Sequence, residues 1–282
     1  MDTGLGGGRQ HFDGRDTEMA ALRRALRRPD CKAVVITGAH GVGKSRLVEE
    51  FSAGAGGRGG HRVVRVQATH SARVLPLSAL APLLPPDGYA EEPAEFIRRV
   101  RQRMAAHRAS AATRTVLVVD DVQLLDPTSL ALIALLSADS SLFLAVTLPD
   151  GADWPDVLRS LWREDALRHI PLSALGEEES ARLLIATMGG PVAAPALRAL
   201  WEASGGNPLC LRELLRSALA DGRLSSVHGV WCLTRPLAPV LPGALLGSRD
   251  RPAGAQRTER LEKPSTVREI LGPHWHPGWV LQ

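Results

Sequence analysis

The sequence has 282 residues, of which 44% are hydrophobic and 23% charged, and its net charge is +4. This composition is typical of a globular protein with one large domain or two small ones. The positive charge comes mainly from arginines interspersed with acidic residues, which is not a strong indication of nucleic-acid binding. No apolar run reaches membrane-spanning length and no N-terminal stretch resembles a signal peptide, so we expect a cytoplasmic protein without a membrane partner.

The three cysteines, Cys31, Cys210 and Cys232, lie far apart in the sequence and lack metal-ligand spacing. An odd number of widely separated cysteines predicts buried free thiols in a reducing compartment.

The first expected helix follows a glycine-rich segment, residues 1–10, which we expect to be disordered. Met19 and Leu22 are spaced as on one face of a helix. Asp16 and Thr17 precede them and are the residues expected to cap this helix.

A phosphate-binding pattern lies between a strand and a helix. Gly38 to Ser45 reads Gly-Ala-His-Gly-Val-Gly-Lys-Ser and fills every fixed position of G-x-x-x-x-G-K-[ST]. Ala33 to Thr37 has the β-branched, apolar character of a buried parallel strand, and a helix is expected from Ser45 onward. The predicted nucleotide-binding residues are Gly38, Ala39, His40, Gly41, Val42, Gly43, Lys44, Ser45 and Arg46.

Each residue type in this loop suits a triphosphate. The glycines let backbone N–H groups approach the phosphates, and the start of the helix adds its positive end. Lys44 brings a mobile charge to the β- and γ-phosphates, and the Ser45 hydroxyl is a suitable Mg²⁺ ligand. The alternative interpretation is a glycine-rich turn that only joins strand to helix.

A second strand is expected at residues 62–68, at a sheet edge, after a glycine-rich loop at residues 53–60. Residues 69–88 are expected to be mostly loop, with a short helix at residues 78–84. A helix is expected at residues 91–107, and its arginine-rich outer face is either solvated or a surface for a polyanion.

Two adjacent carboxylates follow the next buried strand, which reads Thr-Val-Leu-Val-Val-Asp-Asp at residues 115–121. In an open α/β sheet, ligands bind at the carboxyl ends of the strands, so both side chains are expected beside the phosphate loop. We expect Asp120 to hold Mg²⁺ through water and Asp121 to orient or activate the attacking water. The alternative is that the pair simply starts a turn.

The rest of the α/β pattern follows in order. Asp126 is expected to cap a helix that begins at Pro127 and reaches Leu136. A fourth strand is expected at residues 141–147, a helix at residues 153–161, and a fifth strand at residues 167–172.

From Gly176 the pattern becomes helical, with helices expected at residues 177–188, 194–204 and 208–219 and a small hairpin near residues 227–233. We therefore divide the chain into an α/β domain at residues 11–173, a helical subdomain at 174–222 and a hairpin or linker at 223–242. Residues 243–282 lose hydrophobic periodicity and are expected to be disordered.

Together these segments resemble the ATPase module of signal-transduction NTPases with numerous domains (STAND), in the AAA-like branch of P-loop ATPases. They are most similar to the N-terminal part of large ATP-binding LuxR-family transcriptional regulators. The resemblance is carried by Phe12 to Arg15, Gly38 to Ser45, Val116 to Asp121, Asp126 to Ser129, Pro171 to Leu175, Gly205 to Leu209, Arg212 to Leu215 and Gly229 to Trp231.

The fold that these segments predict is a five-stranded parallel sheet of order 5-1-4-3-2, followed by a small helical subdomain. The resemblance implies Mg²⁺-dependent ATP binding with slow hydrolysis. It also implies that Arg15 lies against the nucleotide base and that Pro208 touches the base from the helical subdomain. Such modules act as switches, in which ATP favours closure and assembly and ADP resets the module. The expected partners are therefore ATP or ADP, together with a second copy of the chain or a regulator protein.

Two departures from the family pattern affect these expectations. Family members often carry an arginine just after the fourth strand, where this chain has Leu148, although Thr147 is available as a polar sensor. The winged-helix segment, helical repeats and C-terminal helix-turn-helix of larger members are not visible. We therefore expect a truncated regulator without direct DNA binding.

Three alternative functions remain open at this stage. A non-catalytic, nucleotide-dependent interaction module would bind ATP without turnover. A small-molecule kinase would need an acceptor pocket and a basic lid, and no convincing lid segment is present. A DNA-binding protein would need a localised basic element, and only the helix at residues 91–107 comes near to one.

Overall fold

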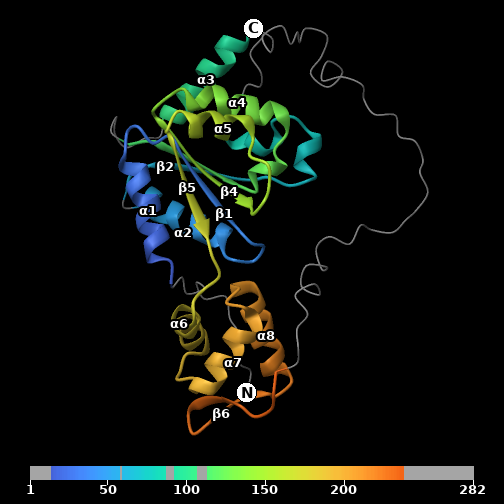
Figure 1. Cartoon of the computed structure of the whole chain (residues 1–282). Coiled ribbons are helices and arrows are strands. Elements are labelled where there is room, and N and C mark those ends of the chain that lie inside the picture. Colours follow the sequence, from blue (N-terminus) through green and yellow to red (C-terminus); the bar gives the residue numbers. More distant parts are fainter. Residues whose placement is uncertain (1–13, 58, 87–91, 107–112, 238–282) are drawn as a thin grey trace, which may run out of the picture.

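The computed structural model describes residues 14–57, 59–86, 92–106 and 113–237 (Figure 1). The predictions made for residues 1–10 and 243–282 fall outside these ranges. Within them, no helix combines the length and the apolarity needed to cross a membrane.

Five parallel strands form the central sheet in the order β2-β3-β4-β1-β5. This is the predicted order 5-1-4-3-2 counted from the other edge, so the predicted fold class is confirmed, with β2 at an edge as expected. The strands are β1 (Ala33–Gly38), β2 (Arg62–Gln67), β3 (Thr115–Asp120), β4 (Leu142–Pro149) and β5 (Leu167–Leu172).

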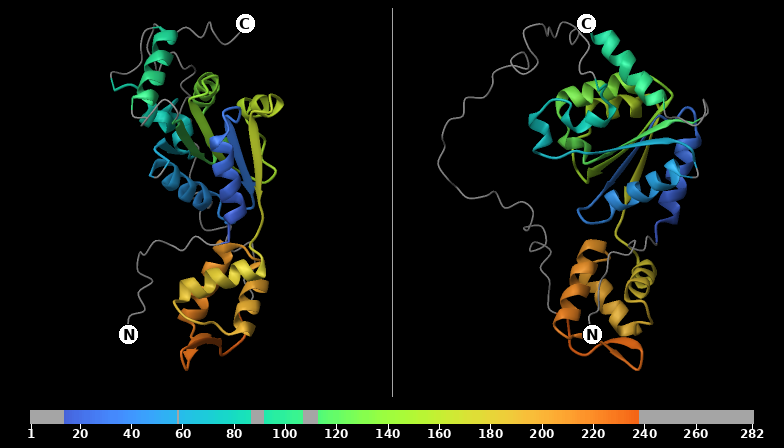
Figure 2. Two further views of the ribbon diagram at one scale, coloured as in Figure 1. Left: turned by 90° about the vertical axis from the view of Figure 1, so that its left-hand side faces the viewer. Right: turned by 180° about the vertical axis from the view of Figure 1, so that it is seen from behind.

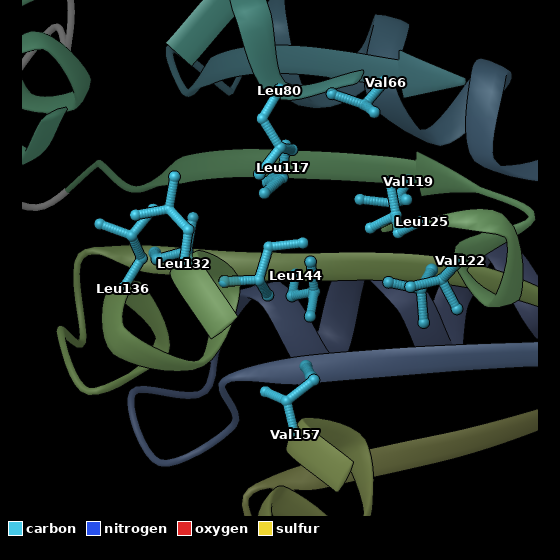
Figure 3. Close-up of a cluster of buried hydrophobic side chains, with 14 of the residues drawn as sticks. Val66, Leu80, Leu117, Val119, Val122, Leu125, Leu132, Leu136, Leu144 and Val157 are labelled. Atoms are coloured by element: carbon cyan, nitrogen blue, oxygen red, sulfur yellow. The ribbon is translucent and has the colours of Figure 1, made fainter. Parts of the chain in front are cut away.

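Helices cover both faces of the sheet, which explains why the central strands are apolar on both sides (Figure 2). On one face, Val34 and Ile36 pack with α1 (Asp16–Arg27) and α2 (Lys44–Gly56). On the other face, Val35 belongs to a cluster that includes Leu132, Leu144 and Val157, several members of which appear in Figure 3. The helices on that second face are α3 (Pro93–Ala105), α4 (Pro127–Ser137) and α5 (Asp156–Arg163), together with the 3-10 turn η2 (Ser78–Leu83).

A second group of helices has its own core. It comprises α6 (Glu177–Met188), α7 (Ala194–Ser204), α8 (Pro208–Ala220) and the hairpin of β6 (Leu224–Val227) and β7 (Val230–Leu233). We call these elements the helical subdomain. Its core gathers Leu184, Leu200, Leu211 and Leu214, with Trp231 packed against them. Figure 1 shows the subdomain beyond the end of the sheet toward which the β5 arrow points.

Two local predictions near the first two helices were wrong. The residue at the cap position of α1 is Arg15, which makes no side-chain capping bond. Asp16 lies in the first turn, where its negative charge interacts favourably with the helix dipole. The expected loop at residues 53–60 is partly helical, because α2 continues to Gly56. Ala55 is buried against the sheet, and this packing outweighs the low helix propensity of the neighbouring glycines.

The fourth strand is longer than predicted. It continues to Pro149, because Leu148 is fully buried and pairs in parallel register with Thr37. The first residue after this strand is therefore Asp150, and Leu148 belongs to the core. The prediction for the thiols was also partly wrong: all three are free, but only Cys31 is buried, while Cys210 and Cys232 are partly exposed.

Candidate functional site

The loop between β1 and α2 has a conformation that depends on its glycines. Gly41 and Gly43 adopt φ angles of 76° and 103°, in the left-handed region. A Cβ atom at Gly38 would lie 2.6 Å from the carbonyl oxygen of Leu172, so this position admits no side chain. The pattern recognised in the sequence therefore has both the backbone angles and the close approach that its glycines predict.

The first turn of α2 is free of the side chains that usually satisfy helix N–H groups. Its cap residue is Gly43, no side chain caps the turn, and the turn contains no acidic residue. By contrast, Asp126 caps α4 and Asn207 caps α8. An anion bound in the loop would satisfy the N–H groups of α2 and would interact favourably with the helix dipole.

Lys44 lies inside the loop rather than in solvent. Its exposed fraction is 9%, and its Nζ donates to the carbonyl oxygens of Gly38 at 2.7 Å and Ala39 at 3.0 Å. Burial lowers the pKa of this ammonium, and the charges of Asp121, Asp150 and Asp120 partly offset that effect. A phosphate bound in the loop would place a negative charge beside Lys44 and so stabilise the charged form of this buried side chain.

The two carboxylates after β3 are organised by Thr147 on β4. Its hydroxyl donates to Asp120 Oδ1 at 2.5 Å and accepts from the backbone N–H of Asp121 at 2.9 Å. Thr147 is fully buried, so it holds the ends of β3 and β4 together at the phosphate-loop edge. Asp121 has a φ of 56°, and its Oδ1 accepts from Gln123 Nε2 at 3.1 Å.

The oxygen ligands needed for Mg²⁺ are present at this edge. Ser45 is exposed in the first turn of α2, and Asp120 is half-buried at the end of β3. Hydroxyl and carboxylate oxygens are ligands that Mg²⁺ accepts, so the donor set fits this ion.

Asp150 is a residue of this edge that the sequence interpretation missed. Its backbone N–H donates to the carbonyl oxygen of Gly38 at 3.2 Å, and its charge acts on Lys44. The position just after the fourth strand is therefore acidic, whereas members of the family that the sequence resembles often carry an arginine there. The available signal was an acidic residue near the end of an apolar run, but the strand end had been placed too early.

The helical subdomain contacts the phosphate loop directly. Asn207 Oδ1 accepts from the N–H groups of Leu209 and Cys210, which caps α8, while Asn207 Nδ2 donates to the carbonyl oxygen of His40 at 2.8 Å. The Leu209 N–H also donates to the Gly41 carbonyl oxygen at 3.3 Å. A Cβ at Gly41 would lie 2.7 Å from Leu209 Cβ, so a glycine is needed for this close packing.

Of three other predicted site residues, two have side-chain partners within the protein. Arg15 is buried, and its Nη2 donates to the carbonyl oxygens of Val42 and Ser173. Arg46 forms ion pairs with Glu49 and Glu50 on its own helix. Pro208 is the half-buried first residue of α8, next to the loop contact made by Asn207.

Arginines on the outer face of α3 form ion pairs and hydrogen bonds with other groups of the protein. Arg98 and Arg99 both pair with Glu95, and Arg101 donates to the carbonyl oxygen of Leu135. These contacts favour the interpretation of α3 as a solvated face over a polyanion surface.

A parallel sheet of this order, with a glycine-rich loop between β1 and α2 and paired carboxylates after β3, defines a P-loop domain of the AAA+ ATPase type. Residues 11–147 match the profile described as AAA ATPase domain. The chain thus contains a AAA+ ATPase-type nucleotide-binding domain. No curated protein matches the sequence.

Several solved structures have folds similar to that of this chain. The chain is similar to the Aeropyrum pernix Orc1 protein in complex with DNA, with a TM-score of 0.55 and 16% identity, over 76% of this chain and 62% of that one. For Cdc6p from Pyrobaculum aerophilum the TM-score is 0.52 and the identity 15%, over 76% of this chain and 64% of that one. For a chain of the HORMA:CdnC:Trip13 complex from *E. coli* MS115-1 they are 0.50 and 13%, over 74% and 83%. The chain spans less than two thirds of the Orc1 and Cdc6p chains, and at these identities the likeness concerns the fold alone.

Proposed function

We propose that this protein binds Mg-ATP, hydrolyses it slowly, and acts as the nucleotide-switch module of a STAND-type regulator similar to the LuxR-family ATPases. The observation that carries the proposal is the meeting of three parts at one edge of the sheet. These parts are the phosphate loop with Lys44, the carboxylates Asp120 and Asp121, and the start of α8.

Each residue of the site has a separate role in this proposal. Lys44 and the N–H groups of the loop bind the phosphates, and Lys44 stabilises the charge that develops on them. Ser45 and Asp120 would hold Mg²⁺, which supplies charge neutralisation on the phosphate oxygens when it is bound. Asp121 orients the attacking water or accepts its proton.

The switch would act through the contact between loop and helical subdomain. Asn207 and Leu209 bond to the carbonyl oxygens of His40 and Gly41, so a change in the loop is transmitted directly to α8. ATP and ADP can shift this equilibrium only if they bind the open and closed arrangements with different affinity. The partner proposed for the closed form is a second copy of the chain or another regulator protein. We propose no direct DNA contact.

A second candidate is a nucleotide-dependent interaction module without turnover. It is favoured by Asp150, because an acidic residue follows β4 where family members often carry an arginine. A carboxylate in this position would disfavour additional negative charge on a transferring phosphoryl group.

The deciding experiment is calorimetric titration of the whole chain with ATP and with ADP in Mg²⁺, with phosphate release measured in the same sample. Micromolar binding with slow release supports the ATPase switch, and binding without release supports the interaction module. Lys44→Ala is expected to abolish binding, because the loop loses its charge for the β- and γ-phosphates. Unchanged nucleotide affinity in a folded Lys44→Ala variant would contradict both candidates.

A further inference from the structure

Arg15 is buried at the junction of three parts of the molecule. Its exposed fraction is 6%, and it stands at the cap position of α1. Its Nη2 donates to the carbonyl oxygen of Ser173 at 2.6 Å and to that of Val42 at 3.2 Å, while Nη1 donates to Glu18 at 3.1 Å. A single guanidinium thus joins α1, the phosphate loop and the segment that leaves β5.

That segment is the covalent link to the helical subdomain. β5 ends at Leu172 and α6 begins at Glu177, so residues 173–176 connect the two cores. Leu175 in this connection donates its N–H to the Gly206 carbonyl oxygen at 2.8 Å, and its own carbonyl oxygen accepts from Trp201 Nε1 at 3.1 Å. The connection is therefore held by Arg15 at its start and by the turn before α8 further on.

The contacts close a circuit through the phosphate loop. From Val42 they run through Arg15 to Ser173, then along the connection to Gly206, and return through Asn207 to His40. The carbonyl oxygens on both sides of Gly41 thus accept hydrogen bonds. The oxygen of His40 accepts from Asn207 in the helical subdomain, and that of Val42 accepts from Arg15, which also holds the connection to this subdomain. Movement of either part changes the hydrogen bonds of the other.

We propose that Arg15 is a positioning residue that couples the conformation of the phosphate loop to the placement of the helical subdomain. It acts through the carbonyl oxygens of Val42 and Ser173 and does not contact the nucleotide base. Both hydrogens of its Nη2 have carbonyl partners, and its Nη1 is paired with Glu18, so the guanidinium is fixed within the protein. The nucleotide part of this inference rests on the proposed function, whereas the coupling itself does not.

The first test needs no nucleotide. Arg15→Met keeps the apolar stem and removes every donor, Arg15→Lys keeps a positive charge and some donors, and Arg24→Met changes an exposed arginine of the same helix. Amide hydrogen exchange is followed at residues 173–176 and 207–211, with α4 as the internal reference. We expect exchange in Arg15→Met to be about 10- to 100-fold faster, the range expected for lost hydrogen bonds to a charged group. Arg15→Lys should fall in between and Arg24→Met should match the wild type. Unchanged exchange in both Arg15 variants overturns the proposal.

The second test separates positioning from base contact. Affinities for ATP and for inorganic tripolyphosphate, which has no base, are measured with the same variants. A positioning role predicts that Arg15→Met weakens both ligands by the same factor, whereas a loss confined to ATP overturns the proposal in favour of base contact. If the wild type binds neither ligand, the proposed function fails, and the exchange test decides the coupling by itself. If Arg15→Met does not fold, Arg15→Lys decides in both tests.

Discussion

At the residue scale, the site depends on a few side chains that are held by hydrogen bonds within the protein. Lys44 bonds to two carbonyl oxygens of its own loop, and Thr147 bonds to both residues of the carboxylate pair. Such preorganisation places charges before the ligand arrives, so that little reorganisation is needed when it binds. Asp121 and Thr147 can be tested separately, because one acts on the attacking water and the other on the geometry of the strand ends.

Asp121→Asn is expected to retain ATP binding and lose turnover by about 100-fold or more, the usual contribution of a positioned general base. The amide keeps the size of the side chain and its bond to Gln123 can re-form, but it cannot accept a proton from water. Binding by calorimetry and phosphate release give the two readouts. Wild-type turnover in this variant would exclude Asp121 from the catalytic role.

Thr147→Val is expected to lower the free energy of unfolding by about 1–3 kcal/mol, because it leaves the part-buried N–H of Asp121 without its acceptor. The valine has nearly the same shape, so the loss isolates the hydroxyl. Urea denaturation measures the change, and Thr147→Ser, which keeps the hydroxyl, serves as the control. If the valine variant were as stable as the wild type, another acceptor would have to satisfy that N–H group.

At the element scale, the start of α8 combines two tasks in one side chain. The oxygen of Asn207 caps the helix, and its amide nitrogen binds the phosphate loop. The amide of asparagine carries both a donor and an acceptor, which explains why this residue type suits the position. Capping and docking can therefore be separated by substitution.

Asn207→Asp is expected to keep the cap but lose the bond to the His40 carbonyl oxygen, because a carboxylate has no N–H to donate. Asn207→Ala should lose both, and with the cap about 1 kcal/mol of stability. Thermal denaturation reports the cap, and hydrogen exchange at residues 207–211 reports docking. Equal protection of these amides in the aspartate variant and the wild type would show that docking does not depend on the Asn207 amide.

At the scale of the whole molecule, two cores are joined by a short connection and a set of polar contacts. The sheet and its helices form one set of hydrophobic clusters, and the helical subdomain forms another.

His61 is a titratable residue whose protonation affects the stability of the part of the molecule that contains the sheet. Its Nδ1 accepts a hydrogen bond from the backbone N–H of Arg114 at 2.9 Å. Burial lowers the pKa of His61, and the positive charge of Arg114 acts in the same direction.

Stability is therefore expected to fall as the pH drops below about 6.5, the ordinary pKa of histidine in an unfolded chain. In that range the unfolded chain binds a proton at His61 more readily than the folded protein does, so acid favours unfolding. Urea denaturation at pH 7.5 and pH 5.5 measures the difference. His61→Asn keeps an acceptor without titrating and should reduce the pH dependence. His228→Asn, in the exposed turn between β6 and β7, should leave it unchanged. Identical pH dependence in the His61 variant would remove this residue as its source.

The sequence by itself determined the strands and the phosphate loop, because these follow from local patterns. The strand order, which pairs segments as distant as Ala33 and Leu144, was predicted as part of the fold that the motifs together indicate. A buried strand, a fixed glycine spacing and a helix start are all encoded within a few neighbouring residues, as at Ala33 to Ser45. The boundaries of the last three main helices were likewise predictable, since hydrophobic periodicity and the residues at their ends agree.

Only the tertiary structure decided the contacts between segments that are distant in sequence. Arg15 meets Ser173 across 158 positions and Asn207 meets His40 across 167, and no local pattern encodes such pairs. Leu148 belongs to the core and Asp150 to the phosphate edge because parallel pairing with β1 extends β4 by two residues. Short sequence motifs thus determine which chemical groups the site contains. Its coupling to the helical subdomain arises from tertiary packing, because packing brings hydrogen-bonding groups together regardless of their separation along the chain.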